Sequence, residues 1–523
     1  MSIWFALNLP ALPLQLAERA LDPAFARACA LAVVDGPVQR SKIAFCNNKA
    51  SAAGVAAGMK LAAAQARARD LIAIEHDAQK EQRALLDLAC WAYQFSAQIV
   101  PFRAHTDSGL LIEIGASVRL FGGHDSLCRL IVEGLRKLGL QCCAASAATP
   151  AAARVLARAR ASGCLAKETS GQARGNARAA ANANDPAQLR ACLGRLPLQM
   201  LAWDEAAAQT LLALGLRTIE DILCLPRDAF ARRFGAQRLI DLDRMLGSIA
   251  DPQPPFHPPE RFAARVELPA DLIDVPQLLP PLRHLLLLLE GFLRGKGAGA
   301  TALQLRAHHS PRRDRANAPT LIDLALASPE RDVLRLLLLF TERMARVQLR
   351  EPAVELELQL ERMDDWQAHN ASFLPPALQA HGVDALHLAE TLHARLGTEG
   401  VFQLQALGDH RPEYAYRTLA LTPDPPASPA VAPPPAQRPL LILTTPHALH
   451  AGHADEGRPL YGGPLALLAG PERIEAGWWD LGYPQRATVH RDYFVARNPR
   501  GQTVWIYREL VAPHRWFLHG FFS

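Results

Sequence analysis

Two proline-rich stretches divide this chain and restrict most strongly the folds open to it. The first, DPQPPFHPPERF at 251–262, has the composition of a stiff tether between folded parts. The second, TPDPPASPAVAPPPAQRP at 422–439, holds too few large apolar residues to fold alone. Because 523 residues also exceed what one hydrophobic core accommodates, we expect several domains.

Before the tether the pattern predicts an α/β part followed by a helical part. Residues 1–165 alternate short apolar strands, beginning at Ile3–Leu9, with Ala-rich helices. Residues 189–250 look all-helical, with a break at Gly215 and an N-cap at Thr218 that begins the next helix.

After the tether the pattern predicts a small sheet with two helices on one face. The expected elements are a strand near 263–268, a helix near 276–294, a strand near 300–309, a basic loop at 310–319, a strand at 320–327, a helix at 329–346 and a strand at 353–361. Residues 440–523 read as β-rich, and RDYFVARNPRGQTVWIYREL predicts a hairpin that turns at NPRG.

Charge and cysteine usage set broad limits on function. A net charge of +5 and a pI near 8.8 are compatible with nucleic-acid binding without requiring it. The nine cysteines form no CxxC pair, so we expect reduced thiols in a cytoplasmic protein. No signal peptide opens the chain, and the longest apolar run, Leu285–Leu289, is far short of a membrane span. We therefore expect no membrane partner.

Three segments, taken in order, resemble the Y-family (translesion) DNA polymerases. GVAAGMKLAAAQARARDL (54–71) is similar to a fingers segment, GLLIEIGASVRLFGG (109–123) to the second palm strand, and the block around Gly215 to a helix-hairpin-helix-like thumb. The resemblance implies palm and fingers at 1–165 (fingers about 15–85), a thumb at 166–250, the tether at 251–262, a little finger-like βαββαβ domain at 263–363, a clamp-binding or linker region at 364–421, the proline-rich linker at 422–439 and a partner-binding region at 440–523.

Four later segments indicate a more specific resemblance, to one branch of these proteins. They are DHRPEYAYR (409–417), GPERIEAGWWD (470–480), RDYFVAR (491–497) and RWFLHGFFS (515–523), and together they resemble the ImuB family. That family is a branch of Y-family-like proteins in bacterial SOS mutagenesis cassettes and is regarded as catalytically inactive. The resemblance implies three protein partners: the sliding clamp, an ImuA-like RecA-related protein and an error-prone C-family DNA polymerase.

The metal-binding carboxylates of a polymerase are missing at the expected positions. Polymerases hold two divalent ions with carboxylates, and Mg²⁺ requires oxygen ligands. In active Y-family enzymes two alternate positions of the first strand carry acidic residues, and alternation places both on one face. In this chain the matching positions are Leu7 and Leu9. The acidic pair of the second palm strand falls on Ser108 and Gly109, although a slip of one residue places Asp107 near the first position.

The nucleotide-binding positions are also replaced. The Tyr and Arg that reach the incoming triphosphate in the Y family fall on Asn48 and Ser51, and the aromatic gate falls near Leu12. No register of Ser2–Glu18 supplies a carboxylate before Glu18. We therefore predict a pseudo-polymerase with no metal and no cofactor. One alternative is an active low-fidelity translesion polymerase that uses rearranged carboxylates, Asp107 and Glu113, and another is a structural protein unrelated to DNA.

Cations of the little finger-like domain are the candidate DNA contacts. A strand side lined with cations can follow a phosphate backbone without reading bases, whereas the plain alternative is a solvated charged loop. The candidates are Arg294, Lys296, Arg306, Arg312, Arg313 and Arg315.

The stretch WQAHNASFLPPAL (366–378) is the candidate clamp-binding peptide. The resemblance implies such a peptide here, with a Gln followed by aliphatic and aromatic anchors that lodge in a hydrophobic groove. Gln367 or Asn370, with Phe373 and Leu374, would serve, and the alternative is a linker with one buried Phe.

Aromatic side chains concentrate near the end of the chain. Trp and Phe dominate interface energetics when they fill pockets, but they can equally form the core of a small β domain. Because WFLHGFFS looks hard to bury in its own fold, we predict a partner-docking role for it. The candidate partner-binding residues are Trp478, Trp479, Trp516, Phe517, Phe521 and Phe522.

Overall fold

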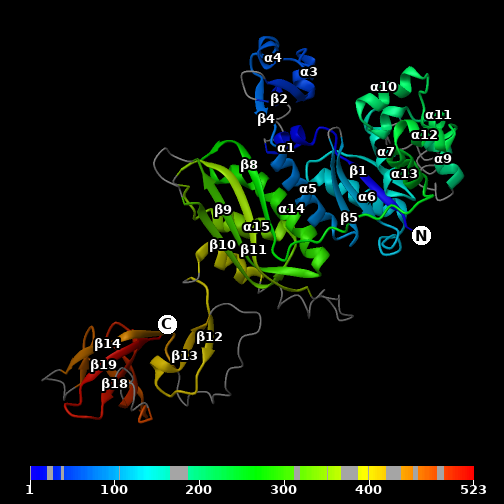
Figure 1. Ribbon diagram of the computed structural model, residues 1–523. Coiled ribbons are helices and arrows are strands. Elements are labelled where there is room, and N and C mark those ends of the chain that lie inside the picture. Colours follow the sequence, from blue (N-terminus) through cyan, green and yellow to red (C-terminus); the bar gives the residue numbers. More distant parts are fainter. Residues whose placement is uncertain are drawn as a thin grey trace. The chain divides into compact units, whose positions relative to one another are not determined.

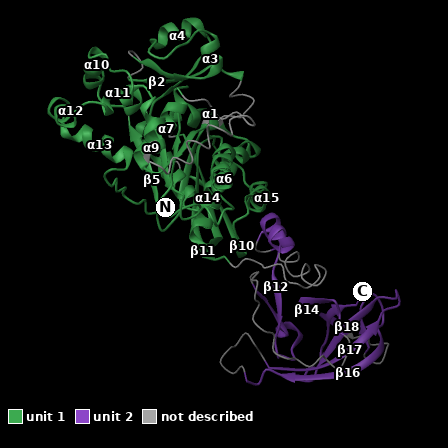
Figure 2. Ribbon diagram, turned by 90° about the vertical axis from the view of Figure 1, so that its right-hand side faces the viewer, with its two compact units in different colours: residues 1–380 green, residues 381–523 purple. Residues whose placement is uncertain are grey.

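The chain divides into two compact units, Met1–Ala380 and His381–Ser523 (Figure 2). They are described one at a time, from a computed structural model whose described residues are 2–20, 28–36, 41–104, 107–164, 186–310, 318–349, 351–366, 387–397, 400–419, 438–451, 458–479 and 488–522. Figure 1 labels the elements along the chain.

A four-stranded antiparallel sheet forms the centre of the N-terminal part. Its order is β5-β6-β1-β7, with β1 at Trp4–Asn8, β5 at Ile99–Ala104, β6 at Asp107–Glu113 and β7 at Cys143–Ala147. Helices α5 (Ala78–Ala92), α6 (His124–Lys137) and α7 (Pro150–Ala161) belong to this part. Ala6 and Leu7 point to opposite faces of β1 and both are fully buried, so both faces of the sheet are covered.

A smaller sheet and its helices follow the first strand. The order is β3-β2-β4, where β2 (Leu31–Asp35) pairs with β3 (Lys42–Cys46) and with β4 (Ile72–Glu75), and the helices are α1 (Leu12–Ala20), α3 (Asn48–Ala52) and α4 (Leu61–Arg67). The side chain of Asn47 caps α3 by accepting from the N–H of Ala50 at 2.9 Å. The same amide donates to the carbonyl of Cys29 at 2.9 Å and accepts from the N–H of Leu31 at 3.1 Å, which ties the cap to the beginning of β2.

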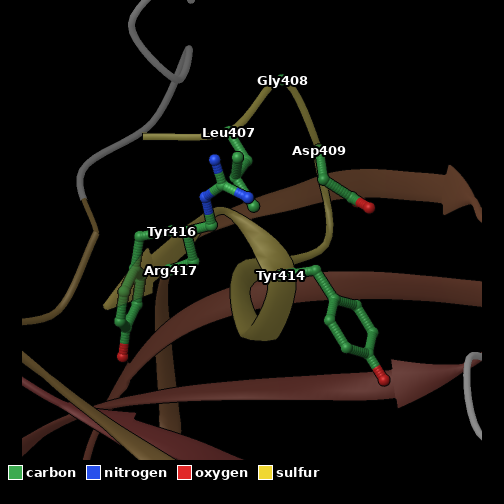
Figure 3. Close-up of a pocket in the computed structure, with 6 residues that line it drawn as sticks. All are labelled: Leu407, Gly408, Asp409, Tyr414, Tyr416 and Arg417. Carbon is green, nitrogen blue, oxygen red and sulfur yellow. The ribbon is translucent and has the colours of Figure 1, made fainter. Parts of the chain in front are cut away.

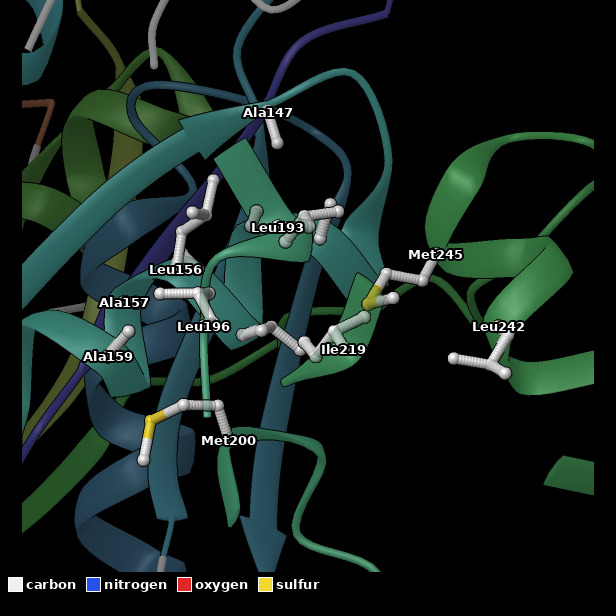
Figure 4. Packing of buried hydrophobic residues seen from close by; sticks show 14 of the residues in the cluster. Ala147, Leu156, Ala157, Ala159, Leu193, Leu196, Met200, Ile219, Leu242 and Met245 are labelled. Carbon is white, nitrogen blue, oxygen red and sulfur yellow. The ribbon is translucent and has the colours of Figure 1, made fainter. Parts of the chain in front are cut away.

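The predicted helical part is confirmed. It contains α9 (Pro186–Gly194), the 3₁₀ turn η1 (Leu198–Leu201), α10 (Glu205–Ala213), α11 (Ile219–Leu223), α12 (Arg227–Phe234) and α13 (Ala236–Leu246). Thr218 and Asp221 form the reciprocal capping box of α11, and Gly215 adopts a φ of 80°. Leu196, Ile219 and Met245 share one core with α7 (Figure 4).

The βαββαβ order after the tether is also confirmed. Its elements are β8 (Ala263–Leu272), η2 (Val275–Leu278), α14 (Leu279–Lys296), β9 (Ala298–His309), β10 (Thr320–Glu330), α15 (Val333–Met344) and β11 (Ala353–Asp365). The antiparallel sheet has the order β10-β9-β11-β8. Most of the predicted basic loop lies outside the described residues.

The second unit is β-rich, as predicted. A helix at 387–396 precedes β12 (Gln403–Ala406), η3 (Pro412–Tyr414) and β13 (Tyr416–Leu419), and a six-stranded sheet follows. Its order is β15-β14-β19-β18-β17-β16, formed by β14 (Leu441–Ala451), β15 (Pro459–Leu460), β16 (Ala466–Ala476), β17 (Val489–Arg497), β18 (Thr503–Glu509) and β19 (Trp516–Phe521).

The predicted hairpin joins β17 to β18. Arg497 pairs with Thr503, and Asn498 fixes the turn because its side chain accepts from the N–H groups of Arg500 and Gln502. The mixed α/β and α+β fold class with a β-rich C-terminal region is therefore confirmed. In the part of the chain that the structure describes, no helix is long and apolar enough to cross a membrane.

Candidate functional site

Hydrocarbon side chains occupy the positions in and beside β1 for which the sequence predicts the loss of metal-binding carboxylates. Leu7 lies between Leu110 of β6 and Ala144 of β7, and its side chain is completely buried. Leu9 and Leu12 are equally enclosed, each with at most 1% of its surface exposed. None of these side chains offers an oxygen to a cation.

The two predicted positions on the second strand serve the packing of the sheet. The Ser108 hydroxyl donates to Glu81 Oε1 at 3.1 Å, and Arg103 Nε donates to Glu81 Oε2 at 2.8 Å. At Gly109 a Cβ atom would stand 1.8 Å from the carbonyl oxygen of Leu7. No side chain therefore fits at residue 109 unless β1 moves.

Asp107, at the beginning of β6, lies on the sheet face opposite to Leu7 and Ser108, and its oxygens are already engaged. Only 3% of the residue is exposed. The amide of Asn8 on β1 donates to its Oδ1, while Arg158 and Arg154 of α7 contact its Oδ2, the latter at 3.4 Å. A dication at this place would displace two guanidinium groups and an amide.

Glu113 lies at the opposite end of β6 and cannot share a metal with Asp107. Six residues of strand correspond to about 20 Å. The Glu113 carboxylate accepts from the N–H groups of Ile3 and Gly115, both at 3.0 Å. The structure therefore does not bring together the two carboxylates of the alternative active polymerase.

A pocket of about 370 Å³ opens beside Asp107, between α7 and the helical part. Arg154, Arg158 and Arg244 line it, but so do Asp241 and Asp251. Burial lowers the pKa of the Arg154 guanidinium, and the neighbouring Asp107 opposes that shift. Counting Asp107, three cations face three carboxylates, so the pocket offers little net charge to a triphosphate.

Sequence reasoning missed the part that Arg154 and Arg158 play. They stand four residues apart on α7, so they share one helix face, and the other side of that helix is mostly alanine and buried. Two cations in this spacing on a largely buried Ala-rich helix favour a polar or charged partner, and that signal could have indicated an ion pair without identifying Asp107.

The described residues contain no group of three or more His, Cys, Asp or Glu side chains close enough to hold a metal ion. Of the predicted nucleotide positions, Asn48 and Ser51 lie exposed on α3, and Leu12 begins α1.

The candidate DNA-binding cations lie in separate places. Arg294 and Lys296 end α14, where Arg294 pairs with Glu290 at 2.6 Å. Arg306 lies eight residues into β9, about 26 Å along the strand, and donates to Gln304 at 2.6 Å. Arg312, Arg313 and Arg315 lie outside the described residues, as do the clamp-peptide candidates Gln367, Asn370, Phe373 and Leu374.

The four segments that carry the ImuB resemblance meet in the second unit. Arg491 donates to Glu413 at 2.9 Å, and the Tyr493 hydroxyl lies 2.8 Å from His519 Nδ1. Arg411, with 1% exposed, pairs with Asp409 and lies 5.7 Å from the ring of Trp479. Each segment therefore contacts another through a charged or aromatic side chain.

Aromatic stacking continues this network into the core. The ring of Trp505 stacks on Tyr493 at 4.1 Å and on His519 at 5.7 Å. Burial lowers the pKa of His519 to about 4, so its ring is neutral at physiological pH. The network is therefore a buried framework that joins the 409–414 turn to the sheet.

A shallow pocket lies beside this turn. Leu407, Gly408, Asp409 and Arg417 line it, with Tyr414 and Tyr416 on either side of η3 (Figure 3). The Arg417 guanidinium donates to Gln405 at 2.7 Å, which fixes one wall of the pocket. The pocket shows no grouping of acid, base and nucleophile.

The predicted partner-binding aromatic residues fall into two groups, an exposed pair at Trp478 and Trp479 and a partly buried group in and beside β19. Trp478 and Trp479 are 68% and 49% exposed, with ring centroids 5.4 Å apart. The expectation that the tail is hard to bury in its own fold is wrong, because β19 lies between β14 and β18. Its aromatic residues are partly buried against the two cores of this sheet; they are Trp516, Phe517, Phe521 and, just after the strand, Phe522.

A family model and two known proteins match this chain. Residues 14–158 match the IMS family, described as the impB/mucB/samB family. Over 499 residues the chain is 27% identical to Protein ImuB of Caulobacter vibrioides strain NA1000 / CB15N, a match that covers 90% of this chain and 100% of that protein. The predicted resemblance to ImuB is confirmed. Protein ImuB of Caulobacter vibrioides strain ATCC 19089 / CIP 103742 / CB 15 matches with the same identity and coverage.

Two solved structures are similar to this chain. A Y-family DNA polymerase chimera, Dbh-Dpo4(243-245)-Dbh, is 16% identical with a TM-score of 0.37, and the match covers 70% of this chain and 100% of that one. DinB from Sulfolobus solfataricus is also 16% identical with a TM-score of 0.35, over 69% of this chain and 98% of that one.

Proposed function

We propose that this protein is a non-catalytic, Y-family polymerase-like adaptor in SOS-induced translesion synthesis and mutagenesis. The observation that carries the proposal is the palm centre. Leu7 and Leu9 occupy the first strand, Gly109 has no room for a side chain, and Asp107 is held by Arg158, Arg154 and Asn8. Without a second carboxylate, nothing at this centre holds two dications.

The ImuB resemblance supports the proposed partners. They are the sliding clamp, an ImuA-like RecA-related protein, an error-prone C-family DNA polymerase that performs the synthesis, and damaged or primer-template DNA, all in the cytoplasm. We assign the clamp to Gln367 or Asn370 with Phe373 and Leu374, and DNA to the cations of the βαββαβ domain. We assign the remaining protein partners to the second unit.

Within the second unit, Trp478 and Trp479 are the strongest candidates for a partner contact. They are large, adjacent and exposed, whereas the aromatic residues of β19 are tied into the sheet. Exposed Trp pairs gain binding energy when a partner covers them. Trp516, Phe517, Phe521 and Phe522 would then act by keeping the sheet folded.

A capture experiment tests this assignment. The double variant Trp478→Ser/Trp479→Ser of the full chain should lose at least tenfold in recovery of the ImuA-like or C-family partner and still recover the clamp. The matched control Leu467→Ser/Leu468→Ser removes two equally exposed apolar side chains from β16 and should recover all partners. Equal recovery of every partner by the Trp variant would contradict the assignment.

DNA binding requires its own test because one alternative is a structural protein unrelated to DNA. The affinity of the full chain for a primer-template should fall as salt rises, since cations that contact phosphates release counterions on binding. Replacing Arg306 by Gln should weaken binding uniformly across sequences. An affinity that is absent at low salt would favour the structural alternative.

The second candidate function is an active low-fidelity translesion polymerase that uses Asp107. One observation favours this second candidate: Asp107, at the beginning of β6, is a carboxylate that accepts a hydrogen bond from the side chain of Asn8 at the end of β1. A nucleotide-incorporation assay distinguishes the non-catalytic adaptor from the active polymerase.

A further inference from the structure

Helix α14 of the βαββαβ domain is apolar on nearly all sides. Its run Leu285–Leu289 contains four leucines that are almost fully buried, and Phe292 and Leu293 continue the pattern. A helix that covers one face of a sheet needs only one apolar stripe. The composition of α14 therefore requires neighbours on two sides.

The second neighbour of α14 is α5 of the palm part. On one side α14 contacts β8, β9, β11 and α15, and on the other it contacts α5 along much of its length. The two helices approach closely because glycine stands at the contact. A Cβ atom at Gly291 would lie 2.4 Å from Trp91 Cδ1, and one at Gly295 would lie 2.9 Å from Tyr93 Cδ1.

Trp91 is held from both directions at this contact. A Cβ atom at Gly134 of α6 would lie 2.4 Å from Trp91 Cζ2, so the indole is wedged between α6 and α14. Trp91 is 4% exposed. A rigid aromatic ring seated between two glycines allows little sliding of the helices past each other.

Contacts continue to the other end of α5. Lys80 Nζ donates to Glu267 of β8 at 2.7 Å, although this exposed pair adds little stability. α1 also contacts β8. His284 of α14 lies close to Gly139 after α6, where a Cβ atom would stand 3.2 Å from His284 Nε2. The interface thus follows the 15 residues of α5, a length of about 22 Å.

The tether itself is bound to the palm sheet. The N–H of Phe256, midway along 251–262, donates to the carbonyl of Ile99 on β5 at 3.0 Å. This bond prolongs the β5 edge into the tether, so the linker has a fixed path at its centre.

From these contacts we infer that the palm and the βαββαβ domain form one rigid body, locked by α5 against α14, and that the tether is not a hinge. DNA that binds this domain meets a surface already fixed relative to the palm. Binding is accompanied by no swing of the domain.

Pulsed electron paramagnetic resonance on the full chain tests the inference. Spin labels carried by non-natural amino acids, chosen because the chain has nine cysteines, would be placed at exposed Arg129 on α6 and exposed Leu321 on β10. We expect a single narrow distance distribution that is unchanged when a primer-template is added. A broad or two-peaked distribution, or a shift of more than about 5 Å with the primer-template, would overturn the inference.

Two variants change the contact in opposite ways. Gly291→Leu crowds Trp91, and Trp91→Ala removes the wedged ring, so each should broaden the distribution. Gly408→Leu is the matched control, because a Cβ atom at Gly408 meets nothing within 4 Å. Circular dichroism identifies a variant that fails to fold. The distance distribution of the variant that does fold then tests whether this contact is the lock. A folded variant with an unchanged narrow distribution would show that this contact is not the lock.

Discussion

Asp107 is a buried carboxylate whose contacts are structural. Its oxygens accept from Asn8 and from two arginines of α7, and Arg158 also donates to the carbonyl of Met200 at the start of the helical part. The buried anion is neutralised by the guanidinium groups of α7. Because both charges are enclosed, each depends on the other.

We predict that Asp107→Asn costs roughly 3–5 kcal/mol of folding stability, because it leaves buried guanidinium charge without its partner. Denaturant unfolding followed by circular dichroism measures the loss. Asp125→Asn is the control, since the Asp125 side chain is 76% exposed, and it should change stability by less than about 0.5 kcal/mol. Similar stabilities for the two variants would contradict a structural role for Asp107.

Protonation of His519 should make the folding stability of the second unit fall as the pH is lowered. Its pKa in the folded chain is about 4, below the ordinary 6.5, so the unfolded state binds the proton more tightly. The stability it contributes is complete above pH 6.5 and is lost as pH falls from 6.5 through 4.

The second prediction follows from this sign. The unfolding midpoint of the second unit should fall between pH 7.5 and 4.5, with roughly 1–3 kcal/mol lost. His519→Gln should flatten this dependence, whereas His447→Gln, at an exposed position, should retain it. An equally steep dependence in both variants would exclude His519 as its origin.

At the scale of elements, β19 determines whether the second unit exists as a sheet. It pairs with β14 on one side and with β18 on the other. Removing a central strand leaves two unpaired edges and opens both apolar cores.

We therefore predict that a chain ending at residue 514 loses the folded sheet, with Trp505 exposed to quencher. Fluorescence quenching and near-ultraviolet circular dichroism measure this loss. A matched deletion at the edge strand β15, residues 459–460, should leave the remaining strands folded. A truncated chain that kept a buried Trp505 would contradict the central role of β19.

Sequence patterns correctly predicted the elements that depend on residues within one continuous segment. The capping box at Thr218, the βαββαβ order and the hairpin at Asn498 follow from residue spacing within one segment. The burial of β19 could not be predicted in this way, because its partners β14 and β18 reach it only through nonlocal pairing. The ion pair of Asp107 was missed for the same reason, since Arg158 lies 51 residues away.

At the scale of the whole molecule, the chain combines an enclosed centre in the N-terminal sheet with proposed binding surfaces elsewhere. The sequence reading of Leu7, Leu9 and Ser108 as replaced metal positions remains a prediction about activity. The structure adds that Leu7 and Leu9 are buried and that Asp107 is paired with Arg158. The exposed pair Trp478 and Trp479 is the proposed contact surface of the second unit.

Primer extension under single-turnover conditions tests the central claim most directly. Excess full-length chain would be mixed with a primer-template and all four nucleotides, in Mg²⁺ and separately in Mn²⁺, with Asp107→Ala as the paired variant. The account predicts no incorporation above the enzyme-free background in either metal, and no difference between the chain and the variant. Extension by the unaltered chain that disappears with Asp107→Ala would contradict it.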